Sequence, residues 1–93
     1  MPVSTHMSHL LKACSVTYQM IERRDYVKRI YGDQYAIKMR IPTSIIRGVK
    51  KDTGKSTLDA GLEVGQKAIA DGNRDAVNLI IAAMVDMIEA GEV

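Results

Sequence analysis

The stretch from Ala36 to Ser56 constrains the fold of this chain most, because its apolar pattern changes at a proline. Before the proline, apolar and basic residues alternate in the order Ile37, Lys38, Met39, Arg40 and Ile41. A period of two places the apolar side chains on one face of a β-strand and the cations on the other. Pro42 ends the strand and suits the first turn of a following helix. The pattern therefore predicts a short, half-buried strand with a basic outer face.

The residues before this strand allow two interpretations. One is that a helix predicted over residues 8–23 continues into the segment 25–41. The other is a β-hairpin, since Gly32 and Asp33 suit a two-residue turn. Pairing about this turn puts most apolar residues on one face and most basic or polar residues on the other, with Val27 and Lys28 as exceptions. That consistency favours the hairpin, while the longer helix remains the alternative.

Three helices are predicted after Pro42. The first runs from about Thr43 to Asp52, ends at Thr53-Gly54, and is followed by a cap at Ser56 or Thr57. The second runs to about Ala70 and is expected to bury Leu58, Leu62, Val64, Ala68 and Ile69. A turn over residues 71–73 leads into the last helix, residues 74–90. The expected fold class is mainly α with a short β-strand or hairpin, an N-terminal helix and an apolar C-terminal helix.

The last predicted helix is apolar almost all round, which is typical of either the centre of a fold or a subunit interface. The chain has 93 residues, no Trp and no Phe, so a monomer has little aromatic bulk to bury. We expect one domain over residues 7–93, with residues 1–6 as a flexible start or tag remnant. We also expect a homo-oligomer, most simply a dimer, whose interface contains Val77, Ile80, Ile81, Met84 and Met87.

Charge is distributed unevenly along the chain. Residues 1–55 contain eleven Lys or Arg against four Asp or Glu, a balance of +7, and residues 56–93 contain two against seven, a balance of −5. A basic half suggests an anionic partner, such as duplex DNA or an acidic protein surface, although both halves can also be ordinary solvated faces.

The sequence lacks the residues that several classes of function need. His6, His9 and Cys14 offer no fourth ligand for a metal, and the segment 48–56 has five residues between its glycines where a phosphate-binding loop needs four. We find no nucleophile beside a base, so we expect no enzyme, cofactor, metal or small-molecule substrate. The single cysteine fits a cytoplasmic protein, and the apolar run 79–85 is too short to span a membrane.

The segment 36–70 resembles the ribbon-helix-helix family of DNA-binding repressors, with a strand at residues 37–41, a helix, the turn Gly54-Lys55-Ser56 and a second helix. In that family two chains pair their strands into a ribbon that enters the DNA major groove. The resemblance implies that the outward residues Ala36, Lys38 and Arg40 read base edges. It further implies that a backbone phosphate is held by Lys55, Ser56 and Thr57. We expect a secondary basic surface at Arg29, Arg47, Lys50 and Lys51.

Three hypotheses follow. The first is a dimeric DNA-binding repressor or a plasmid or phage accessory factor. The second is a small phage-type inhibitor or adaptor that binds a host protein, for example a nucleic-acid-binding complex. The third is a structural oligomer built on the last helix. Salt-sensitive binding to duplex DNA would favour the first, and a protein complex without DNA affinity would favour the second.

Overall fold

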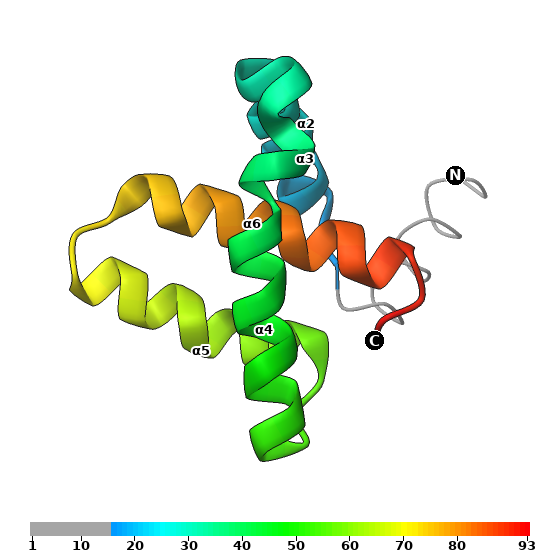
Figure 1. Ribbon diagram of the computed structural model, residues 1–93, viewed down its shortest axis with the longest axis vertical. Coiled ribbons are helices and arrows are strands. Elements are labelled where there is room, and N and C mark those ends of the chain that lie inside the picture. The colour runs from blue at the N-terminus through cyan, green and yellow to red at the C-terminus, as the bar shows by residue number, and fades with distance from the viewer. Residues whose placement is uncertain (1–15) are drawn as a thin grey trace.

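The computed structural model describes residues 16–93, and every regular element in that part of the chain is a helix (Figure 1). The elements in chain order are α2 (Tyr18–Tyr31), the 3-10 turn η1 (Gly32–Gln34), α3 (Tyr35–Lys38), α4 (Arg40–Thr53), α5 (Thr57–Ala70) and α6 (Arg74–Glu89). The prediction of a strand or β-hairpin is therefore wrong. Without a strand the segment 36–70 cannot form a ribbon-helix-helix core.

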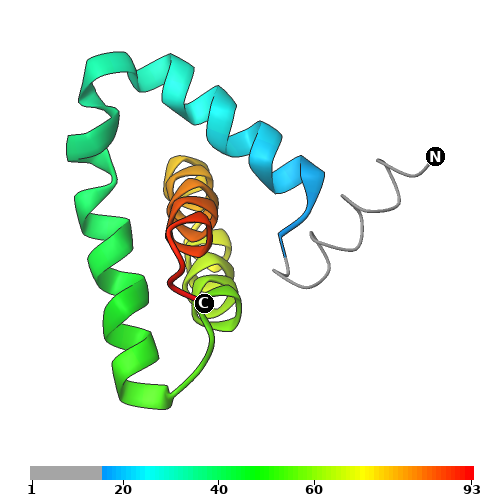
Figure 2. The ribbon, with the colours of Figure 1, turned by 90° about the vertical axis from the view of Figure 1, so that its right-hand side faces the viewer.

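The helices form two parts. α5 and α6 run antiparallel as a helical hairpin, while α2 and α4 form the two arms of an arch around it (Figure 2). The turn η1 and α3 make the corner of the arch. α6 is the central helix, because it packs against α2, α4 and α5. Residues 18–53 are called the arch below, and residues 57–89 the helical hairpin.

The centre of the core lies where α5 meets α6. Met84 and Ile80 of α6 are buried there, while Val85 of the same helix is buried in a second cluster with Val16 and Ile88. A Cβ atom on Gly61 of α5 would lie 2.3 Å from the Cγ and Sδ atoms of Met84. The two helices therefore approach closely because this position has no side chain.

The segment 37–41 is helical, and its side chains are buried at a helical spacing and not at every second residue. Of its three apolar residues only Met39 is buried, whereas Ile37 and Ile41 are exposed. The buried line continues from Met39 at helical spacing through Pro42 and Ile46, and these side chains face the helical hairpin. The alternation of apolar and basic residues therefore does not mark a strand, because Met39 faces the core while Ile37 and Ile41 face outward.

Gly32 does mark a turn, but the turn joins two helices. Its backbone has φ of +52°, which an L side chain rarely adopts, and its amide donates to the Lys28 carbonyl oxygen to close α2. Asp33 and Gln34 then continue as η1. A glycine-aspartate pair thus gives the same local sequence pattern for a helix end as for a hairpin turn.

The three helices predicted after Pro42 are present, although α4 begins at Arg40, three residues before the predicted start at Thr43. Pro42 lies in the first turn of α4, and Gly54 ends that helix with a left-handed φ of +72°. The Ser56 hydroxyl accepts from the Asp59 amide at 3.1 Å, and the Asn73 side chain accepts from the Ala76 amide at 3.1 Å. The predicted burial in α5 is only partly right, because Leu62 and Ile69 are exposed.

The first half of the predicted N-terminal helix (8–23), residues 8–15, falls outside the described residues, as does the predicted flexible start at residues 1–6. Within the described part, α2 begins at Tyr18, where the Thr17 hydroxyl accepts from the Met20 amide at 3.1 Å. It ends at Tyr31, eight residues beyond Arg23, the predicted end. The alternative in which a helix continues past residue 25 is therefore the correct one.

Candidate protein-interaction face

Three isoleucines lie in one line on the outer side of the arch. Ile37, Ile41 and Ile45 are 55%, 72% and 45% exposed, and they follow each other at intervals of four residues. That interval places side chains on the same face of a helix. The line continues to Gly48, which is also exposed. These three isoleucines together with Gly48 are called the isoleucine face.

The isoleucine face spans two helices that are nearly continuous. Met39, between α3 and α4, keeps right-handed helical backbone angles, and its amide donates to the Tyr35 carbonyl oxygen at 3.0 Å. The Thr43 amide donates in turn to the Met39 carbonyl oxygen at 3.1 Å. Pro42 has no amide hydrogen to donate, which explains the interruption between the two helices. The four-residue spacing therefore holds across the junction.

Cations border this face along one edge. Arg40, Arg47 and Lys51 share a side of α4, next to the isoleucine line, by their spacing of seven and four residues. Arg47 is paired with Glu92 at 2.7 Å, whereas Arg40 and Lys51 form no ion pair with any residue among 16–93. These three cations are called the basic edge. Lys38, on the opposite edge, lies over the ring of Tyr31, with its Nζ atom 5.6 Å from the ring centroid.

The residues expected to read DNA do not form one strand face. Ala36 and Lys38 lie on α3, and Arg40 begins α4, so the correction of the strand removes the alternation that aligned them. At the start of α5, Lys55 is paired with Glu63 at 2.9 Å. Thr57 is fully buried, where its amide donates to the Val93 carbonyl oxygen at 3.0 Å.

The other phosphate-binding residues and the secondary basic surface also have roles inside the fold. The Ser56 hydroxyl is occupied by the α5 cap. Lys50 donates to the Thr57 hydroxyl at 2.6 Å, and Arg47 binds Glu92 through two hydrogen bonds of 2.9 and 2.7 Å. Arg29 and Lys51 are exposed. Arg40 and Lys51, at the two ends of α4, are therefore the predicted cations that border the exposed apolar line without an ion-pair partner among residues 16–93.

The predicted oligomer interface lies largely within the chain itself. Ile80, Met84 and Met87 are buried by the other helices, while Val77 and Ile81 are half-buried. The wide apolar face of α6 thus serves as the centre of the fold, one of the two possibilities raised by the sequence. Oligomerisation stays a prediction, but the apolar face of α6 no longer supports it, because the chain itself covers most of that face.

A polar network fastens the arch to the helical hairpin. The Arg24 guanidinium lies 2.6 Å from Glu89 and 2.7 Å from Asp86, and the Tyr35 hydroxyl donates to Asp86 at 2.5 Å. The hydrogen bond to Glu89 contributes most to raising the pKa of Arg24 above its ordinary value. Burial, followed by the hydrogen bond to Asp86, raises the pKa of Tyr35. Because each group is satisfied by another, we interpret this network as structural.

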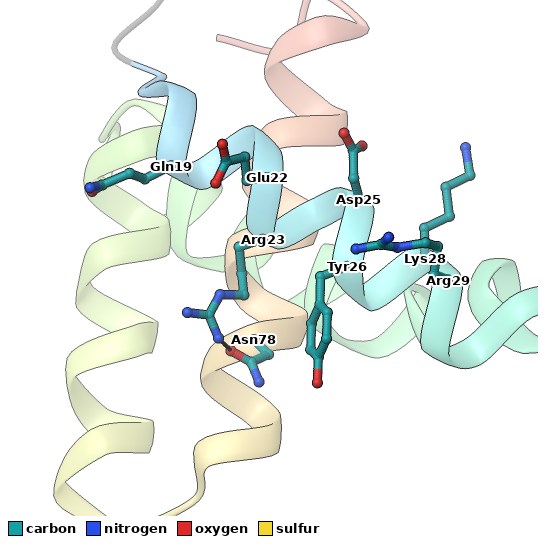
Figure 3. Close-up of a pocket in the computed structure, with 8 residues that line it drawn as sticks. All are labelled: Gln19, Glu22, Arg23, Asp25, Tyr26, Lys28, Arg29 and Asn78. Atoms are coloured by element: carbon teal, nitrogen blue, oxygen red, sulfur yellow. Dashed lines mark hydrogen bonds between the residues drawn. The ribbon is translucent and has the colours of Figure 1, made fainter.

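A broad, open hollow of about 1280 Å³ follows α2 and has mixed polar and apolar walls. Figure 3 shows that Arg23 and Tyr26 point from α2 to the side on which Asn78 of α6 lies, while Asp25 and Lys28 point elsewhere. Arg23 donates to the Asn78 side-chain oxygen at 3.1 Å. Since the lining side chains do not converge on one point, the hollow offers no arrangement for a reaction. Within residues 16–93, no group of three His, Cys, Asp or Glu side chains can hold a metal.

Comparisons with protein-family models, with curated proteins and with solved structures found no significant match. These comparisons add no support to the resemblance between the segment 36–70 and ribbon-helix-helix proteins. The segment 37–41, which would form the ribbon strand, is helical. Among the described helices, none has both the length and the apolar character needed to cross a bilayer.

Sequence reasoning did not identify the isoleucine face, although its residues were part of the pattern. Read at a helical period, residues 37–49 contain two apolar lines. One line runs through Met39, Pro42, Ile46 and Val49, and the other through Ile37, Ile41 and Ile45. Two apolar lines on different sides of α3 and α4 are more than a two-layer fold can bury. This double line was the feature of the sequence that could have indicated an exposed apolar face.

Proposed function

We propose that this protein is a non-enzymatic adaptor or inhibitor that binds an acidic region of another protein through the isoleucine face. The observation that carries the proposal is the exposure of Ile37, Ile41 and Ile45 in one line, on a helix whose inner side is already packed. A single exposed isoleucine is ordinary, but a line of them adds nothing to the core. An apolar line on an exposed helix is a recurrent way to bind a partner.

The basic edge determines the sign of the partner's charge. Arg40 and Lys51 border the isoleucines, and neither has an ion-pair partner among residues 16–93. Carboxylates on a partner would pair with these cations, increase the rate of encounter and fix the orientation of docking. The apolar line would supply most of the affinity, because exposed ion pairs contribute little.

Duplex DNA is the competing partner, and the arrangement of the face favours a protein. DNA binding depends on cations that neutralise phosphates and on polar groups that reach base edges. At this face the central positions are isoleucines, and the cations lie at the border. An isoleucine line set against phosphates would lose its contact with water without gaining an apolar partner.

The first experiment selects partners and tests the face at the same time. A yeast-displayed library of random peptides about 20 residues long, enough for a helix of about 30 Å, is panned on the immobilised protein. We expect enriched peptides to combine carboxylates with apolar residues. Ile41→Asp should weaken their binding at least about tenfold, since it places a charge in the apolar contact.

Ile69→Asp is the matched control, because Ile69 is 65% exposed but belongs to α5. It should change peptide binding less than about twofold. Peptides that bind wild type and Ile41→Asp equally would reject the proposal. A gel shift with random duplex DNA across a salt series completes the test, and strongly salt-dependent binding there would favour the DNA-binding alternative.

A further inference from the structure

We infer that the partner segment is an acidic α-helix that lies close against α4 at Gly48, with one of its apolar side chains seated there. This inference rests on the proposed function and adds the form of the partner and the residue that admits it. Its basis is the contrast between Gly48 and the other two glycines inside helices, Gly61 and Gly65.

Each of the other two glycines has a neighbour inside the fold. A Cβ atom on Gly61 would collide with Met84 at 2.3 Å. A Cβ atom on Gly65 would just reach the Ile80 Cγ2 atom at 4.0 Å. Gly61 is thus required by the packing of α5 on α6, and Gly65 lies at the edge of the same contact.

Gly48 has no such neighbour. It lies inside α4, its φ is not positive, and, apart from the backbone of α4 itself, a Cβ atom there would meet no atom of residues 16–93 within 4 Å. Glycine is among the least favourable residues in a helix interior, so the fold itself would prefer alanine. The remaining physical reason for glycine is close approach from outside, on the face that carries the isoleucines.

The shape of this face fits a helix. Isoleucines at intervals of four residues form a ridge of the kind that packs into the groove of a second helix. The distance between two packed helix axes depends on the side chains at their contact, and glycine permits the shortest distance. A bulky apolar side chain of the partner would fit over Gly48, beyond Ile45 at the end of the ridge.

Charge favours a helix of another protein over a second copy of this chain as the partner. Two copies that packed antiparallel through this face would bring the basic edge of one chain beside the basic edge of the other, and like charges repel. An acidic helix would instead pair with the basic edge. Asp52 follows Gly48 on the same side of α4, so the partner's carboxylates should lie toward Arg40 and Lys51 on the basic edge and away from Asp52.

The test measures the affinity of the selected peptides for three forms of the protein: wild type, Gly48→Ala and Gly65→Ala. Both alanine variants should raise the melting temperature, by about 4 °C, because each removes a glycine from a helix interior. Gly48→Ala should nevertheless weaken peptide binding about tenfold, because its methyl group occupies the space of the partner side chain. Gly65→Ala should leave the affinity within about twofold.

Two contrary outcomes are distinguishable. If no selected peptide depends on Ile41, the proposed function fails and this inference fails with it. If the peptides depend on Ile41 but bind Gly48→Ala as tightly as wild type, the face binds a partner and the close helical approach at Gly48 is wrong. Circular dichroism of the bound peptide adds a third criterion, because a peptide that stays non-helical in the complex would also overturn the inference.

Discussion

The centre of the helical hairpin and the isoleucine face of the arch use apolar residues in opposite ways. In the helical hairpin, Met84, Val85 and Ile80 are buried, and together they hold α6 at the centre of the molecule. In the arch, Ile37 and Ile41 are largely exposed, although isoleucine is as apolar as any of them. The comparison teaches that residue type alone does not separate core from surface, because a helix can carry more apolar residues than its neighbours can cover.

The largest expected effect concerns the buried side of this comparison. Met84→Ala should reduce the free energy of unfolding by about 2–5 kcal/mol, because it leaves a cavity between α5 and α6. Ile41→Ala, on the exposed side, should change it by less than about 0.5 kcal/mol. Urea denaturation of both variants measures the difference. Equal losses would mean that the isoleucine face is part of the core.

The polar fastening between the two parts should have the next largest effect. Arg24→Ala leaves Asp86 and Glu89 without their cation, and we expect a loss of about 1–2 kcal/mol, reduced by the partial exposure of the carboxylates. Arg40→Ala is the control, because Arg40 forms no ion pair within residues 16–93 and should be nearly neutral. If Arg40→Ala lost as much stability as Arg24→Ala, the conclusion that Arg24, and not Arg40, holds the arch to the helical hairpin would be wrong.

A smaller effect is expected at the start of the helical hairpin. Ser56→Ala removes the hydroxyl that accepts from the Asp59 amide and should cost about 1 kcal/mol of stability. Ser56→Asp should retain most of the stability, since its carboxylate can accept the same hydrogen bond and is favourable at a helix N-terminus. Thermal unfolding of the two variants tests this cap, and a full loss in both would show that the hydroxyl acts in another way.

The smallest effect is an alkaline one at the corner of the arch. Because burial raises the pKa of Tyr35, the unfolded chain loses this proton first, near the ordinary tyrosine pKa of about 10. Stability from this group is complete below that pH and decreases as the pH rises above it. Tyr35→Phe should therefore lose less stability than wild type between about pH 10 and 11. Parallel curves for the two proteins would contradict this role of Tyr35.

Local residue chemistry was sufficient for the helical hairpin. Ser56 and Asn73 begin its two helices because their side chains can accept from orphan amides, and Gly54 ends α4 just before them because it tolerates a positive φ. These effects act within a few residues, so the sequence alone determined where α5 and α6 begin and end along the chain. It also determined that the chain has a basic and an acidic half.

Tertiary structure decided the rest. The alternation over residues 37–41 fits a strand or a helix equally well until one knows that only Met39 faces the helical hairpin. Gly32-Asp33 fits a turn of either kind, and packing of α2 on α6 selects the helical one. The candidate face arises at the same point, because Ile37, Ile41 and Ile45 are on the side of the arch that no other described helix covers. Burial depends on distant neighbours, and a sequence read locally does not contain them.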